Sequence, residues 1–96
     1  MTRTIQINDD WVGKTGGKTP IDIVNTGVKP YELYILNPYN DVAKVKLAYM
    51  ADEWTVVKTE EYDVNPNDVK TIIVDGFWPR IRVESDKSVY ILVLRR

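Results

Sequence analysis

Apolar and polar side chains alternate along two neighbouring segments near the middle of the chain, 31–36 and 43–50. The second segment reads AKVKLAYM, with its lysines on one face and its larger apolar residues on the other, which is the period of two of a half-buried strand. The first segment is apolar on both faces, because Tyr34 and Leu36 lie opposite a leucine and an isoleucine. The turn-forming residues 37–41 between the segments predict a β-hairpin, one strand of which has a second face that must also be covered.

The same alternation continues on either side of this hairpin. Short runs separated by Gly, Pro, Asn and Asp recur at a spacing of about ten residues, and none has a helical period. The further runs are 2–7, 21–24, 54–59, 69–74, 80–84 and 88–94. About eight short strands of this kind predict an all-β fold, an antiparallel β-sandwich or jelly roll, in a single domain spanning 1–96. Residues 8–20, with three glycines and a proline, are predicted to form a loop or an arm that becomes ordered on a neighbouring subunit.

The apolar faces of the runs predict the core. We expect the following side chains to be buried: Ile5, Ile23, Val45, Leu47, Ile73, Ile81 and Val83. In the run 80–84, charged residues alternate with apolar ones, so one face of that strand is expected to be solvated or ion-paired. The run 88–94 is apolar on both faces, which is typical of a central strand or of a strand whose outer face meets a partner.

Composition removes most kinds of site chemistry. The chain has 96 residues, of which 44% are hydrophobic and 28% charged, as in an ordinary globular domain. Its net charge of −1 argues against a general nucleic-acid binder. With no cysteine and no histidine, thiolate chemistry, the commonest general base and the commonest metal ligand are missing. We therefore expect no enzyme activity and no cofactor.

The N-terminal residues and the lengths of the apolar runs bear on the location of the protein, and its residue bias bears on its source. The first residues, MTRTIQINDDW, lack the apolar core of a signal peptide, and no run approaches the roughly 18 apolar residues that span a bilayer. We expect a protein that is made in the host cytoplasm and becomes part of a virion, or alternatively one that stays in the cytoplasm, in either case without a membrane partner. A single glutamine, no histidine and no cysteine form a bias that is associated with heat-adapted proteins.

Two short motifs resemble ligand-binding loops but depart from them. Gly17-Lys18-Thr19 matches the end of a phosphate-binding loop, yet Val12 stands where that loop requires its first glycine. The residues from Asp63 onward begin like a calcium-binding loop, yet the glycine and the bidentate glutamate of that loop are replaced by Asp68 and Val74. We therefore predict a plain loop at the first site, a proline turn at the second, and no bound metal.

The turn motifs and strand pattern of residues 25 to 96 resemble a group of small phage proteins. The matching features are Asn25-Thr26-Gly27, Asn37-Pro38, Asn65-Pro66, Asp75-Gly76-Phe77 and the final stretch RVESDKSVYILVLR. These features are similar to those of head-associated phage proteins, including head decoration proteins. They also resemble the sensory rhodopsin transducer group and immunoglobulin-like accessory modules. The first resemblance implies a structural protein of a virion, bound to a capsid shell.

Two classes of function follow. The first is a self-associating or capsid-binding structural protein, because the two-faced apolar strands exceed what one small core covers. Its expected interface residues are Trp11, Tyr34, Leu36, Trp78, Tyr90, Leu92 and Leu94. The second class is a binding module in which Trp11, Trp54 and Trp78 form a stacking platform for a sugar or another flat ligand, or a signalling adaptor like the transducers.

Overall fold

The computed structural model describes residues 3–7, 11–14, 20–25, 30–74 and 78–95. These residues form nine strands and no helix. The strands are β1 (Arg3–Ile7), β2 (Trp11–Lys14), β3 (Ile21–Asn25), β4 (Tyr31–Leu36), β5 (Ala43–Met50), β6 (Val56–Val64), β7 (Val69–Val74), β8 (Arg80–Ser85) and β9 (Tyr90–Arg95). The all-β prediction is confirmed, with one strand more than the eight expected.

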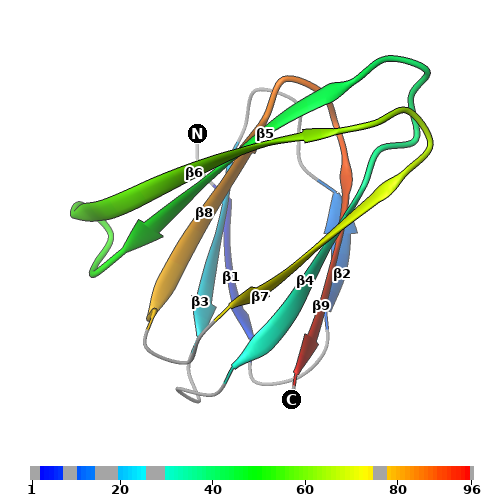
Figure 1. Cartoon of the computed structure of the whole chain (residues 1–96). Coiled ribbons are helices and arrows are strands. Elements are labelled where there is room, and N and C mark those ends of the chain that lie inside the picture. Colours follow the sequence, from blue (N-terminus) through cyan, green and yellow to red (C-terminus); the bar gives the residue numbers. More distant parts are fainter. Residues whose placement is uncertain (1–2, 8–10, 15–19, 26–29, 75–77, 96) are drawn as a thin grey trace.

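The strands form two sheets that pack face to face (Figure 1). The five-stranded sheet has the order β1-β3-β8-β5-β6, and the four-stranded sheet has the order β2-β9-β4-β7. Every pairing is antiparallel except that of β1 with β3, which is parallel. The architecture is therefore the predicted β-sandwich, with a parallel pair at one edge that the alternation did not indicate.

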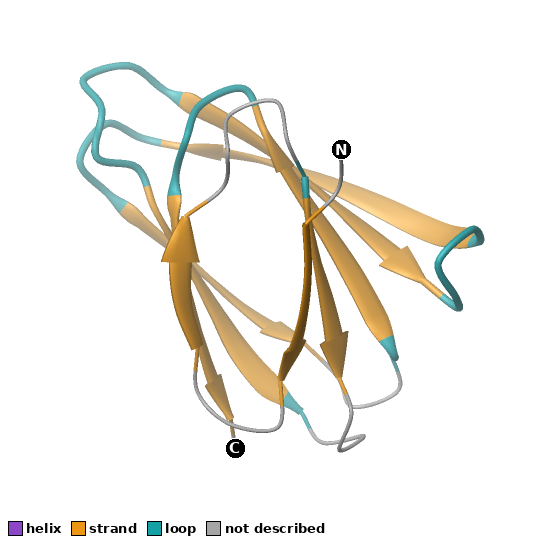
Figure 2. Cartoon of the chain, turned by 180° about the vertical axis from the view of Figure 1, so that it is seen from behind, coloured by secondary structure: helices purple, strands orange, loops and turns teal. Residues whose placement is uncertain are grey.

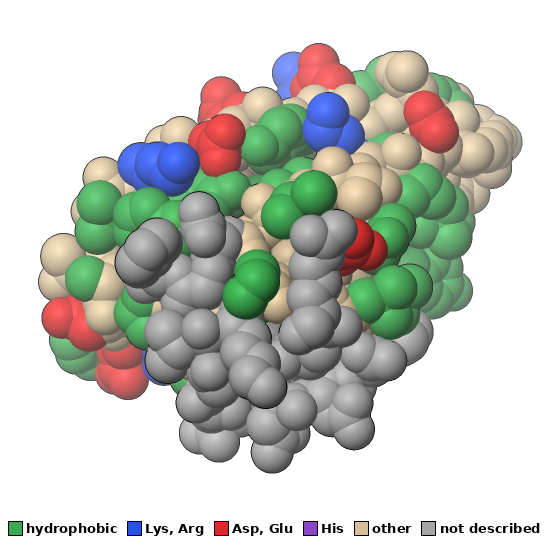
Figure 3. Space-filling view, turned by 60° about the horizontal axis from the view of Figure 1, so that its bottom comes forward, with side chains coloured by type: hydrophobic (Ala, Val, Ile, Leu, Met, Phe, Trp, Pro, Cys, Tyr) green, Lys and Arg blue, Asp and Glu red, His purple; other side chains and the backbone are tan. Residues whose placement is uncertain are grey.

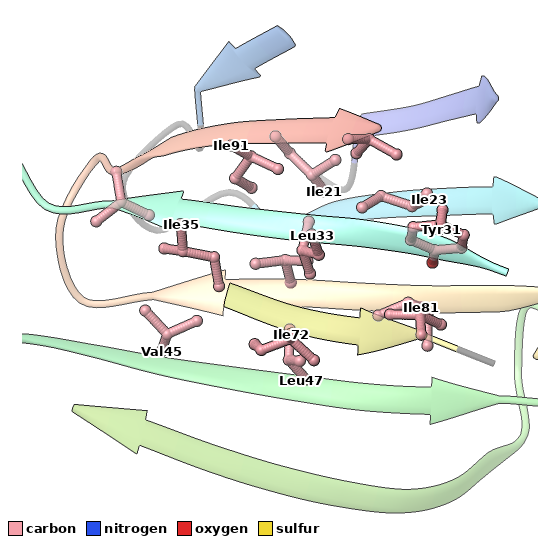
Figure 4. Close-up of a cluster of buried hydrophobic side chains, with 14 of the residues drawn as sticks. Ile21, Ile23, Tyr31, Leu33, Ile35, Val45, Leu47, Ile72, Ile81 and Ile91 are labelled. Atoms are coloured by element: carbon pink, nitrogen blue, oxygen red, sulfur yellow. The ribbon is translucent and has the colours of Figure 1, made fainter. Parts of the chain in front are cut away.

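The core lies between the two sheets, where side chains from β3, β4, β5, β8 and β9 meet (Figure 4). Of the predicted core, Ile23, Val45, Leu47, Ile81 and Val83 are buried, and Ile5 packs against them while partly exposed. These residues occupy strands with strict alternation, where the period of two assigns each face without ambiguity.

The core prediction is wrong at Ile73, which is 62% exposed, whereas Ile72 and Val74 are buried. The run VKTIIV contains two adjacent isoleucines, so its pattern alone does not decide which of them faces inward. Pairing decides it, because Ile72 lies opposite the buried Leu33 of β4. Since one step of register moves a whole strand face from core to solvent, a single misplaced residue reverses the assignment.

Shortening each isoleucine by one methyl group tests this assignment. Ile72→Val is expected to lower the free energy of unfolding by about 0.5 to 1.5 kcal/mol, because the change leaves a small cavity in the core. Ile73→Val, at an exposed position, should change it by less than about 0.5 kcal/mol. Urea unfolding of both variants measures the difference, and equal effects would contradict the inward placement of Ile72.

The predicted hairpin between residues 31–36 and 43–50 is not formed. Both segments are strands, but β4 pairs with β7 and β9, whereas β5 pairs with β6 and β8. Residues 37–42 thus carry the chain from one sheet to the other, so that the apolar faces of β4 and β5 oppose each other across the core instead of lying side by side.

Asn37 holds this crossover in place and is fully buried. Its Nδ2 donates hydrogen bonds to the carbonyl oxygens of Asp41 at 2.7 Å, Val64 at 3.0 Å and Asn65 at 3.3 Å. Its Oδ1 accepts a hydrogen bond from the Tyr39 amide at 3.0 Å. One amide side chain therefore joins the 37–42 crossover to the neighbouring crossover between β6 and β7.

Three other local predictions are corrected or refined. Residues 11–14 are a strand paired with β9 and not part of a loop. At the edge of a sheet, pairing on one side and water on the other satisfy the backbone. The run expected over 54–59 is displaced: β6 begins at Val56 and continues to Val64, and Trp54 lies in the preceding turn. The segment after Val64 is the predicted turn, closed by the bond from the Asp68 amide to the Asn65 carbonyl and by a positive φ of 56° at Asn67. The Gly17-Lys18-Thr19 motif lies outside the described residues.

Candidate functional site

On three strands of the four-stranded sheet, β4, β7 and β9, the outer face is nearly free of charge. On the fourth strand, β2, Lys14 is the register partner of Tyr90. Strands β4, β7 and β9 present nine outward positions in three cross-strand rows. Seven of these positions form what we call the apolar face: Tyr34, Leu36, Val69, Ile73, Tyr90, Leu92 and Leu94. The other two are Thr71 and Glu32, and the Glu32 carboxylate accepts a hydrogen bond from the Tyr34 hydroxyl.

A shallow groove runs along this face. Its volume is about 350 Å³, and it is lined by Tyr34, Leu36, Val69, Tyr90, Ile91 and Leu92. Four members of the apolar face are well exposed: Leu36 at 38%, Tyr90 at 43%, Val69 at 47% and Ile73 at 62%. Figure 3 shows a continuous hydrophobic area on the side where β4 and β9 lie in Figure 1, whereas the Lys and Arg side chains in that view lie at its top and left.

The structure brings together five of the predicted interface residues: Tyr34, Leu36, Tyr90, Leu92 and Leu94 all belong to the apolar face. Trp78 does not join them. It packs against the core and meets the Tyr49 ring edge-on, with 5.2 Å between ring centroids. For Trp11 the structure describes the backbone, which pairs with Val93, and its side chain lies outside the description.

The outer face of the five-stranded sheet is charged and is organised around Asp22. This carboxylate is 1% exposed and binds two arginines: Arg80 Nη1 lies 2.6 Å from Oδ2, and Arg82 lies 2.7 Å from Oδ1 through Nε and 3.0 Å from Oδ2 through Nη2. Burial raises the pKa of Asp22, but the hydrogen bonds and charges of Arg82 and Arg80 together bring it below its ordinary value. The ion pairing expected for the run 80–84 is confirmed.

A second cavity, of about 240 Å³, opens on this charged face. Its lining consists of Thr4, Asp22, Glu53, Trp54, Arg80 and Arg82. Trp54 is 85% exposed and sits in the turn between β5 and β6, which projects from the body of the sandwich (Figure 2). The Asp52 carboxylate holds that turn by accepting hydrogen bonds from the amides of Trp54 and Thr55, both at 2.8 Å.

Trp78 belongs to a third cluster, on the inner side of β5 and β6. Lys58 Nζ lies 4.6 Å from the centroid of the Tyr49 ring and 5.6 Å from that of Trp78. Burial, a hydrogen bond to Glu60 and the charge of that carboxylate raise the pKa of Tyr49. These contacts use Trp78 for packing, so the predicted platform of several tryptophans is reduced, among the described side chains, to Trp54.

In the described part of the chain, no three His, Cys, Asp or Glu side chains gather in a way that could hold a metal ion. Over the same residues, no helix is long and apolar enough to cross a membrane.

Comparisons with known proteins support the fold. No family model matches the sequence, and no curated protein matches it. Among solved structures, the chain is similar to the pre-peptidase C-terminal domain of a collagenase from Bacillus anthracis, with a TM-score of 0.54 and 12% identity over all of this chain and 95% of that one. At this identity the likeness concerns the β-rich architecture alone.

Proposed function

We propose that this chain is a non-catalytic interaction domain that associates with a second copy of itself through the apolar face. The observation that carries the proposal is the near absence of charge: of nine outward positions on β4, β7 and β9, only Glu32 is charged, and Tyr34 binds its carboxylate. Exposed apolar surfaces of this kind mark interaction sites in proteins that are otherwise polar outside.

The second copy is favoured because the face matches itself. A partner with a charged surface would lose solvation on this face without gaining ion pairs, whereas another apolar face loses nothing. Three strands about 4.8 Å apart and six residues at about 3.4 Å each give a flat area of roughly 300 Å². This is less than half of the roughly 800 Å² that a standard interface buries per partner, so a weak dimer in exchange with the monomer is expected.

A role in a virion stays a prediction from the resemblance of residues 25 to 96 to phage head proteins. The same apolar face would then lie against other copies or a capsid shell. The likeness to a collagenase domain concerns fold and adds no argument for that role.

Paired valine variants test the proposal. Val69, 47% exposed in the groove, and Val57, 54% exposed on the other sheet, both lie in edge strands. Val69→Lys should weaken self-association by at least about tenfold, because it buries a charge without a partner, and Val57→Lys should leave association unchanged. Sedimentation velocity over a concentration series measures both.

Circular dichroism and thermal unfolding establish that both variants keep the fold. A wild-type protein that sediments as a monomer up to about millimolar concentration, where even a weak complex forms, would overturn the proposal. Equal weakening by the two valine variants would show that association uses a different surface.

A further inference from the structure

We propose that the cavity beside Trp54 binds one pyranose ring of an uncharged glycan, with the sugar stacked on the indole. This site lies on the five-stranded sheet and is independent of the apolar face, which belongs to the other sheet. Three properties of the site support the assignment: an exposed aromatic ring on a hydrogen-bonded turn, polar groups held in place, and a balance of charge.

The indole of Trp54 is largely exposed to solvent. A side chain of this size is usually well buried, yet Trp54 is 85% exposed. Its backbone is fixed by the Asp52 carboxylate and by the bond from the Ala51 amide to the Thr55 carbonyl at 3.0 Å. An exposed indole on a hydrogen-bonded turn offers a flat apolar surface, which suits the C–H face of a sugar ring.

The polar groups of the cavity are oriented before any ligand arrives. Asp22 holds the guanidinium groups of Arg80 and Arg82 with bonds of 2.6 to 3.0 Å. Each guanidinium carries five N–H donors, so these bonds occupy only a minority of them. The Glu53 carboxylate adds acceptors, and the Thr4 hydroxyl adds a group that both donates and accepts. The planar guanidinium and carboxylate groups can form paired hydrogen bonds with neighbouring hydroxyl groups of a sugar.

The charges of the cavity select an uncharged ligand. Two arginines face two carboxylates, those of Asp22 and Glu53, so the lining has no net charge. With no net charge, the lining gives neither an anionic nor a cationic ligand a net attraction, whereas an uncharged ligand rich in hydroxyl groups can bond to the arginines and to the carboxylates. The volume of 240 Å³ is below the roughly 300 to 1,000 Å³ of pockets for drug-sized ligands, which fits one ring with the rest of the glycan outside.

A glycan array probed with the labelled full chain tests the proposal, followed by calorimetric titration with the uncharged oligosaccharide that binds best. Trp54→Ala should weaken binding by roughly tenfold, the scale of one aromatic contact, and leave the melting temperature unchanged. The control is Tyr39→Ala, which removes a 39% exposed aromatic residue outside the cavity lining and should keep wild-type affinity.

Thr4→Val gives a second variant within the cavity, since it removes the hydroxyl and keeps the shape of the side chain. It should weaken binding of the same oligosaccharide, while the association variant Val69→Lys should bind it as well as the wild type does. Failure of every uncharged glycan on the array to bind would overturn the proposal. Equal binding by Trp54→Ala, or preference for sulfated or uronic glycans, would overturn it as well.

Discussion

Replacing Asp22 by asparagine is expected to lower the free energy of unfolding by about 3 kcal/mol at neutral pH. The change removes the buried carboxylate and leaves the charges of Arg80 and Arg82 without their partner. The carboxylate is 1% exposed and accepts hydrogen bonds from two arginines. The arginine side chains are 16% and 25% exposed, which lets them recover part of their solvation and keeps the loss at the lower end of the range for buried pairs.

The loss should depend on pH with a definite sign. Because the two arginines hold the pKa of Asp22 below its ordinary 3.8 despite the opposing effect of burial, the folded state favours the ionised carboxylate. This stabilisation is complete above the pKa of the unfolded chain and disappears as the pH falls through the lower pKa of the folded chain. The gap between wild type and Asp22→Asn is therefore largest at neutral pH and narrows below about pH 4.

Urea unfolding at neutral and acidic pH measures this gap. Asp63→Asn, at an exposed position of β6, provides the matched control and should change the unfolding free energy by less than about 0.5 kcal/mol. If the difference in unfolding free energy between wild type and Asp22→Asn is the same at every pH, the destabilisation comes from the shape of the side chain and not from the charge of Asp22.

Asn37→Ala is expected to be comparably damaging, with a loss of about 3 kcal/mol, because one buried and three partly buried backbone groups lose their partner at once. The amide donates to the carbonyls of Val64 and Asn65 in one crossover and binds Asp41 and Tyr39 in the other. The unpaired Val64 carbonyl, which is buried, costs most of its desolvation free energy, whereas the partly buried groups regain part of theirs by bonding to water.

Two further substitutions separate the hydrogen bonds from the volume of the side chain. Asn37→Asp keeps the shape but loses the Nδ2 donors, so it should destabilise strongly at neutral pH and less in acid, where the carboxyl carries a proton. Asn40→Ala, in the same crossover but exposed, should cost less than about 0.5 kcal/mol. A small effect of Asn37→Ala in thermal and urea unfolding would show that the crossover is held by other contacts.

Strand positions were predictable from the sequence to the extent that alternation is strict, but strand partners were not. The stretch between Leu36 and Ala43 has the composition of a connection between strands, and it is one. Its composition does not tell whether the following strand folds back or crosses to another sheet. That choice depends on β7 and β9, which occupy both edges of β4 and come much later in the sequence.

The candidate sites also contain residues that the sequence could predict and residues that it could not. Tyr34, Leu36, Tyr90 and Leu92 were predictable as a surface because both faces of their runs are apolar. Val69 was not, because its membership of the groove follows from the pairing of β7 with β4. The cavity beside Trp54 was beyond sequence analysis, since its residues come from four separate segments; the one available sign was an aspartate within the apolar run IDIV.

The strand order also has a consequence for how the chain reaches this structure. Of the strand pairs in the described residues, only β5 with β6 joins strands that follow each other in the chain, and β2 must wait for β9. Folding dominated by such distant pairings is slow, on the order of milliseconds to seconds, and during synthesis β4 remains without either neighbour until residues beyond 69 emerge. Nascent chains therefore expose β4, the first strand of the future apolar face, longest, and chaperone demand should peak before β9 is made.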